Sequence, residues 1–324
     1  YAHNVVEETK SELIKPDKRG IRSVYAEDTP DQKRAWHMWH DLFTVEEEAR
    51  GIRGLREGYD RFFGQFKPKA TTAVREVTIG RATALWVEPQ GRTDGPVVLH
   101  LHGGGFAFGS ALCSVEFCER LAEAVNGRCL ALEYRLAPEN PFPAALDDAC
   151  AAFTWLQEQG VPASQVLLSG ESAGGGLALS AAVALQQAGQ TKPAGIYVLS
   201  PFVDCSLASP SINTMEGKDP IIDRDILTYM ATGYFQATPA QNPLVSPVFA
   251  DLSGLPPILI QASMKEVLVD DAKRLAAKAE ADGVDVQLQL FDERLHIFAT
   301  FPFLSNSSIA MRRLAEFSKQ ALGN

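Results

Sequence analysis

The chain has 324 residues, with 46% hydrophobic and 22% charged residues, a composition that is typical of a globular protein and excludes a globally disordered chain. Its length suits one large domain or two of modest size. The net charge of −10 disfavours nucleic acid as a partner, because a polyanion would be repelled and basic residues cluster only at Lys15, Lys18 and Arg19.

The first 70 residues predict helices and no strands. Thr29 followed by Pro30 is typical of a helix start, since proline suits the first turn. Residues 45–48, Val-Glu-Glu-Glu, place acidic side chains early in a second helix, where the helix dipole favours them. The segment is also rich in aromatic residues: Trp36, Trp39, Phe43, Tyr59, Phe62, Phe63 and Phe66.

From residue 74 onward, short β-rich segments alternate with longer helical patterns. Residues 74–79 and 82–87 flank Gly80 and Arg81 and predict a hairpin. Further strands are expected at 97–101, 129–134, 166–169, 196–200, 258–262 and 286–291, and helices at 115–124, 143–159, 173–188, 270–282 and 307–321. Short apolar strands separated by helices predict an α/β protein with a mainly parallel sheet covered on both faces.

One segment interrupts this alternation. Residues 207–243 are too long for a plain connection between strands, and residues 223–235 have a helical pattern. Long insertions in compact domains are often lids, so we expect this segment to pair with the N-terminal helices as a cap. The chain then divides into an N-terminal cap segment (1–72), a catalytic domain in two parts (73–206 and 244–324), and a cap insertion between those parts (207–243).

The sequence Gly170-Glu-Ser172-Ala-Gly174 has the form Gly-x-Ser-x-Gly, follows an expected strand and opens an Ala-rich helix. This is the context of a nucleophile elbow, in which two glycines allow a tight strand-to-helix turn that exposes the serine hydroxyl. The alternative is a plain glycine turn before a helix. The context favours Ser172 as a nucleophile.

A second glycine motif, His102-Gly-Gly-Gly105, follows the expected strand 97–101. Its glycines allow backbone N–H groups to approach a reacting carbonyl and, with the N–H of the residue after the nucleophile, to stabilise an oxyanion. A phosphate-binding loop fits less well, because the Gly-Lys-Ser/Thr ending and the Gly-x-Gly-x-x-Gly spacing are missing. We expect His102 to shape this loop through hydrogen bonds rather than to act as a base.

A serine nucleophile in this chain order needs a histidine base nearer the C-terminus. Of the six histidines, only His296 follows Ser172. The acid that orients this histidine should follow the strand 258–262, where Glu266, Asp270 and Asp271 are available. Position alone divides the choice between Glu266 and Asp270.

The remaining candidate ligands predict neither a metal site nor an organic cofactor. His37 and His40 are spaced as a metal pair on a helix, but without a third ligand a surface or packing role is expected. The five cysteines are dispersed, fit neither a disulfide framework nor a zinc cluster, and favour a reducing compartment. No apolar run is long enough to cross a membrane, and no signal peptide pattern is visible. We therefore expect a cytoplasmic location, although the start at Tyr1 leaves room for a removed leader.

Together with Tyr134-Arg-Leu-Ala-Pro-Glu139, Phe142-Pro-Ala-Ala145 and His296-Ile-Phe298, these motifs resemble those of the hormone-sensitive-lipase-like carboxylesterases, the bacterial family IV esterases of the α/β-hydrolase fold. The resemblance covers nearly all of residues 74–324. It implies a mostly parallel eight-stranded sheet flanked by helices. It also implies a helical cap made from the N-terminal helices and an insertion after the sixth strand.

The resemblance also implies a role for each site residue. Ser172 is the nucleophile and His296 the base, and the oxyanion N–H groups come from Gly104, Gly105 and Ala173. The acid motif of the family, Asp-x-Leu-x-Asp, reads Glu-Val-Leu-Val-Asp over residues 266–270, so its first position departs from the pattern. The alignment favours Glu266 as the acid with Asp270 behind it. Glu171, at the variable elbow position, is expected to be structural.

The implied activity is hydrolysis of short- to medium-chain acyl esters, of about two to eight carbons, through an acyl-enzyme. The partners are a small-molecule ester and water, and the family includes monomers and homodimers. Lactone or amide hydrolysis with the same residues is an alternative, and so is a non-catalytic receptor, which would lack His296. Candidates for the substrate pocket are aromatic: Trp36, Trp39, Phe43, Phe106, Phe108, Phe202, Tyr229 and Phe235.

Overall fold

Eight strands form a single sheet in the computed structural model, which describes residues 28–323. The strand order is β1-β2-β4-β3-β5-β6-β7-β8. Strand β2 pairs antiparallel with β1 and β4, and all other neighbours pair in parallel. The strands are β1 (Ala73–Ile79), β2 (Ala82–Glu88), β3 (Val97–Leu101), β4 (Arg128–Glu133), β5 (Val166–Glu171), β6 (Gly195–Leu199), β7 (Ile258–Ser263) and β8 (Val286–Phe291). The prediction of an eight-stranded, mostly parallel sheet is confirmed.

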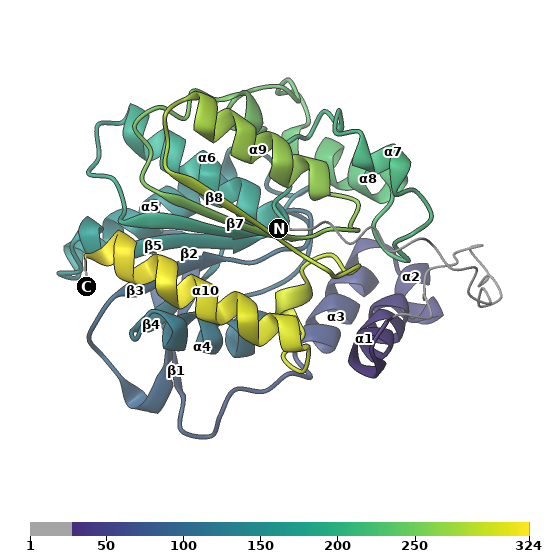
Figure 1. The fold of residues 1–324 in the computed structure, drawn as a ribbon, viewed down its shortest axis with the longest axis horizontal. Helices are drawn as coiled ribbons and strands as arrows, with labels where there is room; N and C mark the ends of the chain where they lie inside the picture. Colours follow the sequence, from purple (N-terminus) through teal and green to yellow (C-terminus); the bar gives the residue numbers. More distant parts are fainter. Residues whose placement is uncertain (1–27, 324) are drawn as a thin grey trace, which may run out of the picture.

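Helices cover both faces of this sheet (Figure 1). One face is covered by α4 (Val115–Ala124) and α10 (Ser305–Leu322). The other is covered by α5 (Ala144–Glu158), α6 (Ala173–Gln187) and α9 (Val269–Ala281). Each of these helices was expected from its periodicity, and only the ends differ, where the last turns commonly fray.

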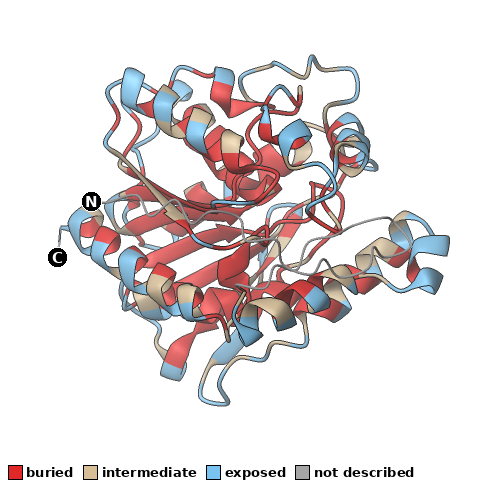
Figure 2. Ribbon diagram, turned by 45° about the vertical axis from the view of Figure 1, so that its right-hand side comes forward, coloured by how far each residue is buried: buried red, intermediate tan, exposed pale blue. Residues whose placement is uncertain are grey.

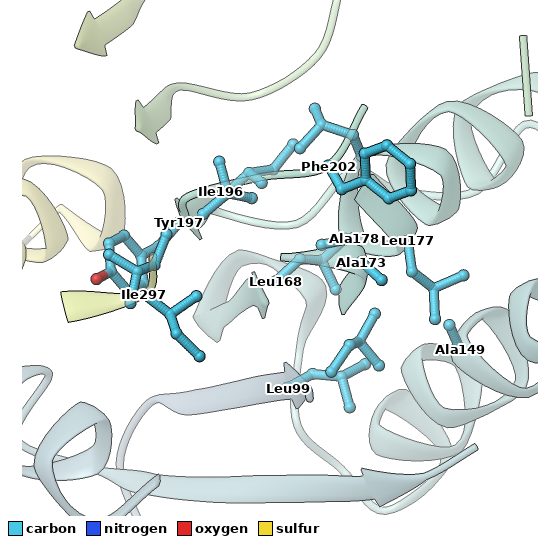
Figure 3. Close-up of a cluster of buried hydrophobic side chains, with 14 of the residues drawn as sticks. Leu99, Ala149, Leu168, Ala173, Leu177, Ala178, Ile196, Tyr197, Phe202 and Ile297 are labelled. Atoms are coloured by element: carbon cyan, nitrogen blue, oxygen red, sulfur yellow. The ribbon is translucent and has the colours of Figure 1, made fainter. Parts of the chain in front are cut away.

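The core lies between the sheet and these helices, where the central strands β3, β5, β6 and β7 are buried along their whole length (Figure 2). Figure 3 shows the cluster where Leu99, Leu168 and Ile196 from three neighbouring strands meet Leu177 of α6 and Ala149 of α5. Continuous apolar strands are expected when both faces of a parallel sheet are covered. This core fixes the strand ends, from which the loops described below extend.

Five further helices, which we call the cap helices, gather at one end of the sheet (Figure 1). They are α1 (Pro30–His40), α2 (Val45–Ala49), α3 (Ile52–Phe63), α7 (Ser211–Thr214) and α8 (Arg224–Phe235). The predicted starts of α1 and α2 are confirmed, because Thr29 and Thr44 each form a capping box. Residues 1–27 of the expected cap segment, including Lys15, Lys18 and Arg19, lie outside the described residues.

Aromatic and polar contacts join the cap helices to each other and to the rest of the chain. The Trp39 ring packs edge-on against Phe62 and Phe301, and its Nε1–H donates to Asp219 Oδ1 at 3.0 Å. The Asp219 carboxylate precedes α8, so this bond ties the N-terminal helices to the insertion. Many of the aromatic residues in the N-terminal segment therefore have a packing role.

Arg56 of α3 anchors the cap helices to two loops at the end of the sheet. Its guanidinium donates to Ala107 O at 2.8 Å and to Ala137 O at 3.0 Å, and it forms an ion pair with Glu139 at 2.7 Å. Ala137 and Glu139 belong to the Tyr134–Glu139 motif. One role of that motif is thus to hold α3 against the loop that follows β3.

Candidate active site

Ser172 occupies a tight turn between β5 and α6, with φ 54° and ψ −123°. This positive φ is unfavourable for a residue with a side chain. The turn needs glycine on either side: a Cβ at Gly170 would lie 2.1 Å from Gly174 O, and one at Gly174 would lie 1.9 Å from Leu101 O. The Ser172 side chain is half-buried, and its hydroxyl contacts His296, which lies on the loop that follows β8.

A chain of hydrogen bonds runs from Ser172 through His296 to Glu266. His296 Nε2 lies 2.8 Å from Ser172 Oγ, and its Nδ1 lies 3.0 Å from Glu266 Oε1. Glu266 is fully buried, and its Oε2 accepts from the Ser200 hydroxyl at 2.6 Å and from the Ser263 N–H at 2.8 Å. Nucleophile, base and orienting acid in this order form the arrangement that activates a serine hydroxyl.

The two neighbouring acids of α9 do not contact His296. The carboxylate of Asp270 lies 3.8 Å from Lys273 Nζ, and its backbone N–H donates to Ser211 Oγ. Asp271 is fully buried and accepts the backbone N–H of Val203 at 2.8 Å. Of the acids that the sequence left open, the structure brings only Glu266 to the histidine. The contacts of Asp270 are with Lys273 and Ser211 and not with Glu266.

The glycine loop after β3 turns back on itself beside the serine. Gly104 has φ +113°, and its carbonyl accepts from the backbone N–H of Ala107 and Phe108 at 3.0 and 2.9 Å. A Cβ at Gly104 would lie 2.0 Å from Phe108 O, so only glycine fits. Among the described residues, no hydrogen bond uses the backbone N–H of Gly104 or Gly105. Ala173 is the first residue of α6, where backbone N–H groups have no partner within the helix.

His102 holds this loop from its buried side. Its Nδ1 donates to Gly103 O at 2.6 Å, and its ring stacks on Tyr134 with centroids 4.3 Å apart. The Tyr134 hydroxyl donates in turn to His102 O at 2.6 Å. Burial lowers the pKa of His102 to about 4, although the bond to Gly103 opposes this shift, so the imidazole is neutral near neutral pH. It shapes the loop as a hydrogen-bond donor.

A cavity of about 400 Å³, counting the space that opens to solvent, lies between the serine and the cap helices. Ser172, His296, Gly104 and Gly105 contribute its polar end. The rest of the lining is apolar or aromatic: Trp39, Leu42, Phe43, Tyr59, Phe108, Ile221, Ile222, Ile226, Met230 and Ile297. A concave, mostly apolar site with a few convergent polar groups is typical of a small-molecule site.

Three of the eight aromatic candidates, Trp39, Phe43 and Phe108, line this cavity. The other five do not. Phe106 stacks on Tyr234 with centroids 3.7 Å apart, and Tyr229 is 51% exposed. Trp36 stacks on His40, Phe202 is buried in the core cluster of Figure 3, and Phe235 is partly buried against the core.

Sequence reasoning missed two groups of residues at this site. Ile226 and Met230 of α8 line the cavity, and so does Ile222, which lies just before this helix. Their spacing of four residues was a signal for one helical face. Ser200 and Ser263, which hold Glu266, lie at the carboxyl ends of β6 and β7. Such ends meet at one edge of a parallel sheet, where ligand sites form.

Within residues 28–323, no group of three or more His, Cys, Asp or Glu side chains is arranged to hold a metal ion. His37 and His40 both lie at the end of α1, where their rings approach Trp36. Over the same residues, none of the helices combines the length and the apolar character needed to cross a membrane.

Comparison with known proteins gives three consistent findings. A family model described as alpha/beta hydrolase fold matches residues 98–300. An acetyl-hydrolase of Streptomyces hygroscopicus is 39% identical over 273 residues, which cover 84% of this chain and 91% of that protein. An esterase of Acinetobacter venetianus is 30% identical over 266 residues, which cover 82% of this chain and 88% of that protein. The crystal structure of an esterase from the bacterial hormone-sensitive lipase family is similar with a TM-score of 0.86 and 34% identity, covering 91% of this chain and 99% of that chain.

Proposed function

Because the chain belongs to the hormone-sensitive-lipase-like esterases of the α/β-hydrolase fold, and is thus a carboxylic ester hydrolase, we propose that it cleaves short acyl esters through an acyl-enzyme on Ser172. The observation that carries this proposal is the hydrogen-bonded series of Ser172, His296 and Glu266 at the polar end of an apolar cavity.

In this mechanism Ser172 Oγ attacks the ester carbonyl while His296 Nε2 takes the hydroxyl proton. Glu266 accepts from Nδ1, which keeps Nε2 facing the serine and stabilises the imidazolium. The backbone N–H groups of Gly104, Gly105 and Ala173 stabilise the tetrahedral oxyanion. His296 then protonates the leaving alcohol, and a water molecule repeats the two steps on the acyl-enzyme.

The shape and chemistry of the cavity support a small, uncharged acyl group. Its lining includes no charged side chain other than the titratable His296, and aromatic and aliphatic groups from α1, α3 and α8 surround the serine. Burying a charged group there without a partner would be unfavourable. A similar protein bears the name acetyl-hydrolase, which agrees with a short acyl chain.

The arrangement also supports a division of the chain into a catalytic domain and a cap. Segments 1–72 and 207–243 contribute α1–α3 and α7–α8, and residues from both line the cavity over Ser172. Segments 73–206 and 244–324 contribute the sheet and the helices that cover it. We assign the cap the task of enclosing the acyl chain.

The test is hydrolysis of p-nitrophenyl esters with acyl chains from acetate to palmitate, with wild type beside Ser172→Ala. We expect the highest kcat/KM at the short end and a loss of at least about a thousandfold in Ser172→Ala, since a triad nucleophile typically contributes several orders of magnitude. Labelling by a fluorophosphonate should also disappear in Ser172→Ala.

Two results would overturn the proposal. If Ser172→Ala kept more than about a hundredth of the activity, the serine mechanism would fail. Faster turnover of palmitate than of butyrate would contradict the short acyl preference. If none of the esters were hydrolysed but the fluorophosphonate still labelled Ser172, lactones and amides would be the next substrates to test.

A further inference from the structure

A buried carboxylate directly before the nucleophile has no part in the mechanism above. Glu171, the last residue of β5, is 5% exposed. Its Oε1 accepts from the Gly103 backbone N–H at 2.8 Å, and its Oε2 lies 2.7 Å from His100 Nε2. The side chain thus bridges a histidine of β3 and the glycine loop that follows the same strand.

His100 is built to hold this carboxylate. It lies opposite Ser169 in the parallel pairing of β3 and β5, and its Nδ1 lies 3.0 Å from Ser169 Oγ, so both ring nitrogens have a neighbour. Burial by itself lowers the pKa of His100, but Cys118 and Glu171 raise it to about 9. Because burial keeps the Cys118 thiol neutral, with its pKa well above the usual range, the Glu171 carboxylate is the charge that the imidazolium meets.

The loop itself is packed tightly against the elbow at Gly103. A Cβ added there would lie 3.1 Å from Glu171 O and 3.3 Å from Ser172 Cβ. The bonds from the His102 ring and the Tyr134 hydroxyl hold carbonyl groups of the loop. The Glu171 carboxylate accepts the N–H of Gly103, which directly precedes the two residues whose N–H groups are assigned to the oxyanion.

We propose that Glu171, held in place by His100, is a positioning residue that sets where the Gly104 and Gly105 N–H groups point relative to Ser172. This inference rests on the proposed function. It gives the carboxylate a specific task beyond filling the core, because an oxyanion donor must lie within about 2.7–3.1 Å of the developing charge to be effective. Loss of this support should weaken transition-state binding without weakening the binding of an uncharged ground state.

The experiment compares three changes at this pair. Glu171→Gln keeps an oxygen that accepts from Gly103 and replaces the charge with an amide that donates to a neutral His100. Glu171→Asp keeps the charge but shortens the reach. The double change His100→Leu with Glu171→Leu removes both polar partners together, which a core tolerates better than one unpaired charge. Glu119→Gln is the matched control, since Glu119 is also a buried carboxylate that accepts a backbone N–H, from Lys69, away from the serine.

Each variant is assayed for kcat/KM on p-nitrophenyl acetate and for binding of two ketones with the same alkyl chain. A trifluoromethyl ketone forms an oxyanion adduct with Ser172, and the methyl ketone binds without reacting. In the double variant we expect kcat/KM and trifluoromethyl ketone affinity to fall together by about ten- to a hundredfold, with methyl ketone affinity unchanged, since removing one oxyanion donor outright costs about a hundredfold or more. Glu171→Asp should show a smaller parallel loss, and Glu171→Gln and Glu119→Gln should stay within about threefold of wild type.

The inference fails if Glu171→Asp and the folded double variant both keep wild-type kcat/KM. It also fails if the rate falls while trifluoromethyl ketone affinity does not, or if Glu171→Gln is as impaired as the double variant. Should the double variant not fold, the comparison of Glu171→Asp with Glu171→Gln decides the question. Ser172→Ala in the same series separates the two proposals: an active Ser172→Ala overturns the proposed function itself, whereas an inactive one with fully active Glu171 variants overturns only this inference.

Discussion

Glu266 stands where the family pattern has aspartate, one methylene shorter, and its surroundings show how the longer side chain is accommodated. The carboxylate is fully buried, yet both oxygens accept hydrogen bonds, from His296 on one side and from Ser200 and Ser263 on the other. A buried carboxylate with all its bonds made is held in one orientation. The imidazole that it faces is therefore fixed in the tautomer that leaves Nε2 free to take a proton.

We predict that Glu266→Gln lowers kcat by roughly a thousand- to ten-thousandfold, because an amide in place of the carboxylate favours the wrong histidine tautomer. Asp270→Asn should stay within about threefold of wild type, since Asp270 contacts Lys273 and not the histidine. Single-turnover and steady-state kinetics on p-nitrophenyl acetate measure both. Equal losses in the two variants would remove Glu266 from its assigned role.

Residue spacing could single out the serine and the histidine but not the acid, which only the family resemblance assigned to Glu266, and the reason is physical. Ser172 has a local signature, and His296 is the one histidine that follows it. The choice of acid depends on Ser200 and Ser263, which hold Glu266 from two other strands. Contacts between strand ends far apart in the chain leave no local pattern, so residue spacing left Glu266 and Asp270 open.

At the scale of elements, α8 presents one face to the cavity and the other to solvent. Ile226 and Met230, four residues apart on α8, line the cavity together with Ile222, which lies just before the helix. The Met230 thioether sits close over the glycine loop: a Cβ at Gly105 would lie 1.8 Å from its Sδ. The adjacent Tyr229 is half exposed. Met230 thus limits the space next to the assigned oxyanion donors.

We predict that Met230→Ala shifts the acyl preference toward longer chains, raising the ratio of kcat/KM for octanoate over acetate by about three- to tenfold, because a methionine truncated in a packed cavity leaves space for further methylenes. The p-nitrophenyl ester series measures this ratio. Tyr229→Ala is the control on the same helix and should leave the profile unchanged. An unaltered profile in Met230→Ala would mean that the acyl chain does not reach α8.

The elements themselves could be predicted well, because the periodicity of apolar residues sets them. The hairpin, the parallel strands and the helices that cover them all appear near their expected positions. The lining of the cavity could not be predicted in the same way. An aromatic residue in a helix, such as Trp36 in α1 or Tyr229 in α8, does not reveal from the sequence which neighbour its side chain contacts, and neither of these two lines the cavity.

At the scale of the whole molecule, a buried network joins α9 to the chain that leaves β6 toward the cap insertion. Asp271 accepts the N–H groups of Val203 and Asp204 and contacts the Ser209 hydroxyl, and Arg274 forms an ion pair with Asp204 at 2.6 Å. Burial raises the pKa of Asp271 to about 7, although its hydrogen bonds to Ser209 and Val203 oppose this shift. The folded protein therefore holds a proton on Asp271 at a pH where the unfolded chain has lost it.

This proton makes stability depend on pH. The contribution of protonated Asp271 is complete below its unfolded pKa of about 3.8 and is lost as the pH rises through about 7. Asp271→Asn does not titrate. We predict that, relative to Asp271→Asn, the Tm of wild type falls between about pH 4 and pH 7 and is level above that range. Thermal melts of both proteins across this range measure the difference, and parallel curves would contradict the prediction.

The bond between Trp39 and Asp219 joins residues 180 positions apart in the chain. Helices α1–α3 leave the ribosome before the sheet and before α8, so the aromatic side chains that contact Asp219 and Phe301 lack these partners until most of the polypeptide has been made. Closing so long a loop is favourable only once packed surfaces on both sides offset its entropy. The contacts that join α1–α3 to Asp219 and Phe301 therefore form late in synthesis, and until then the aromatic side chains that make them stay exposed to chaperones.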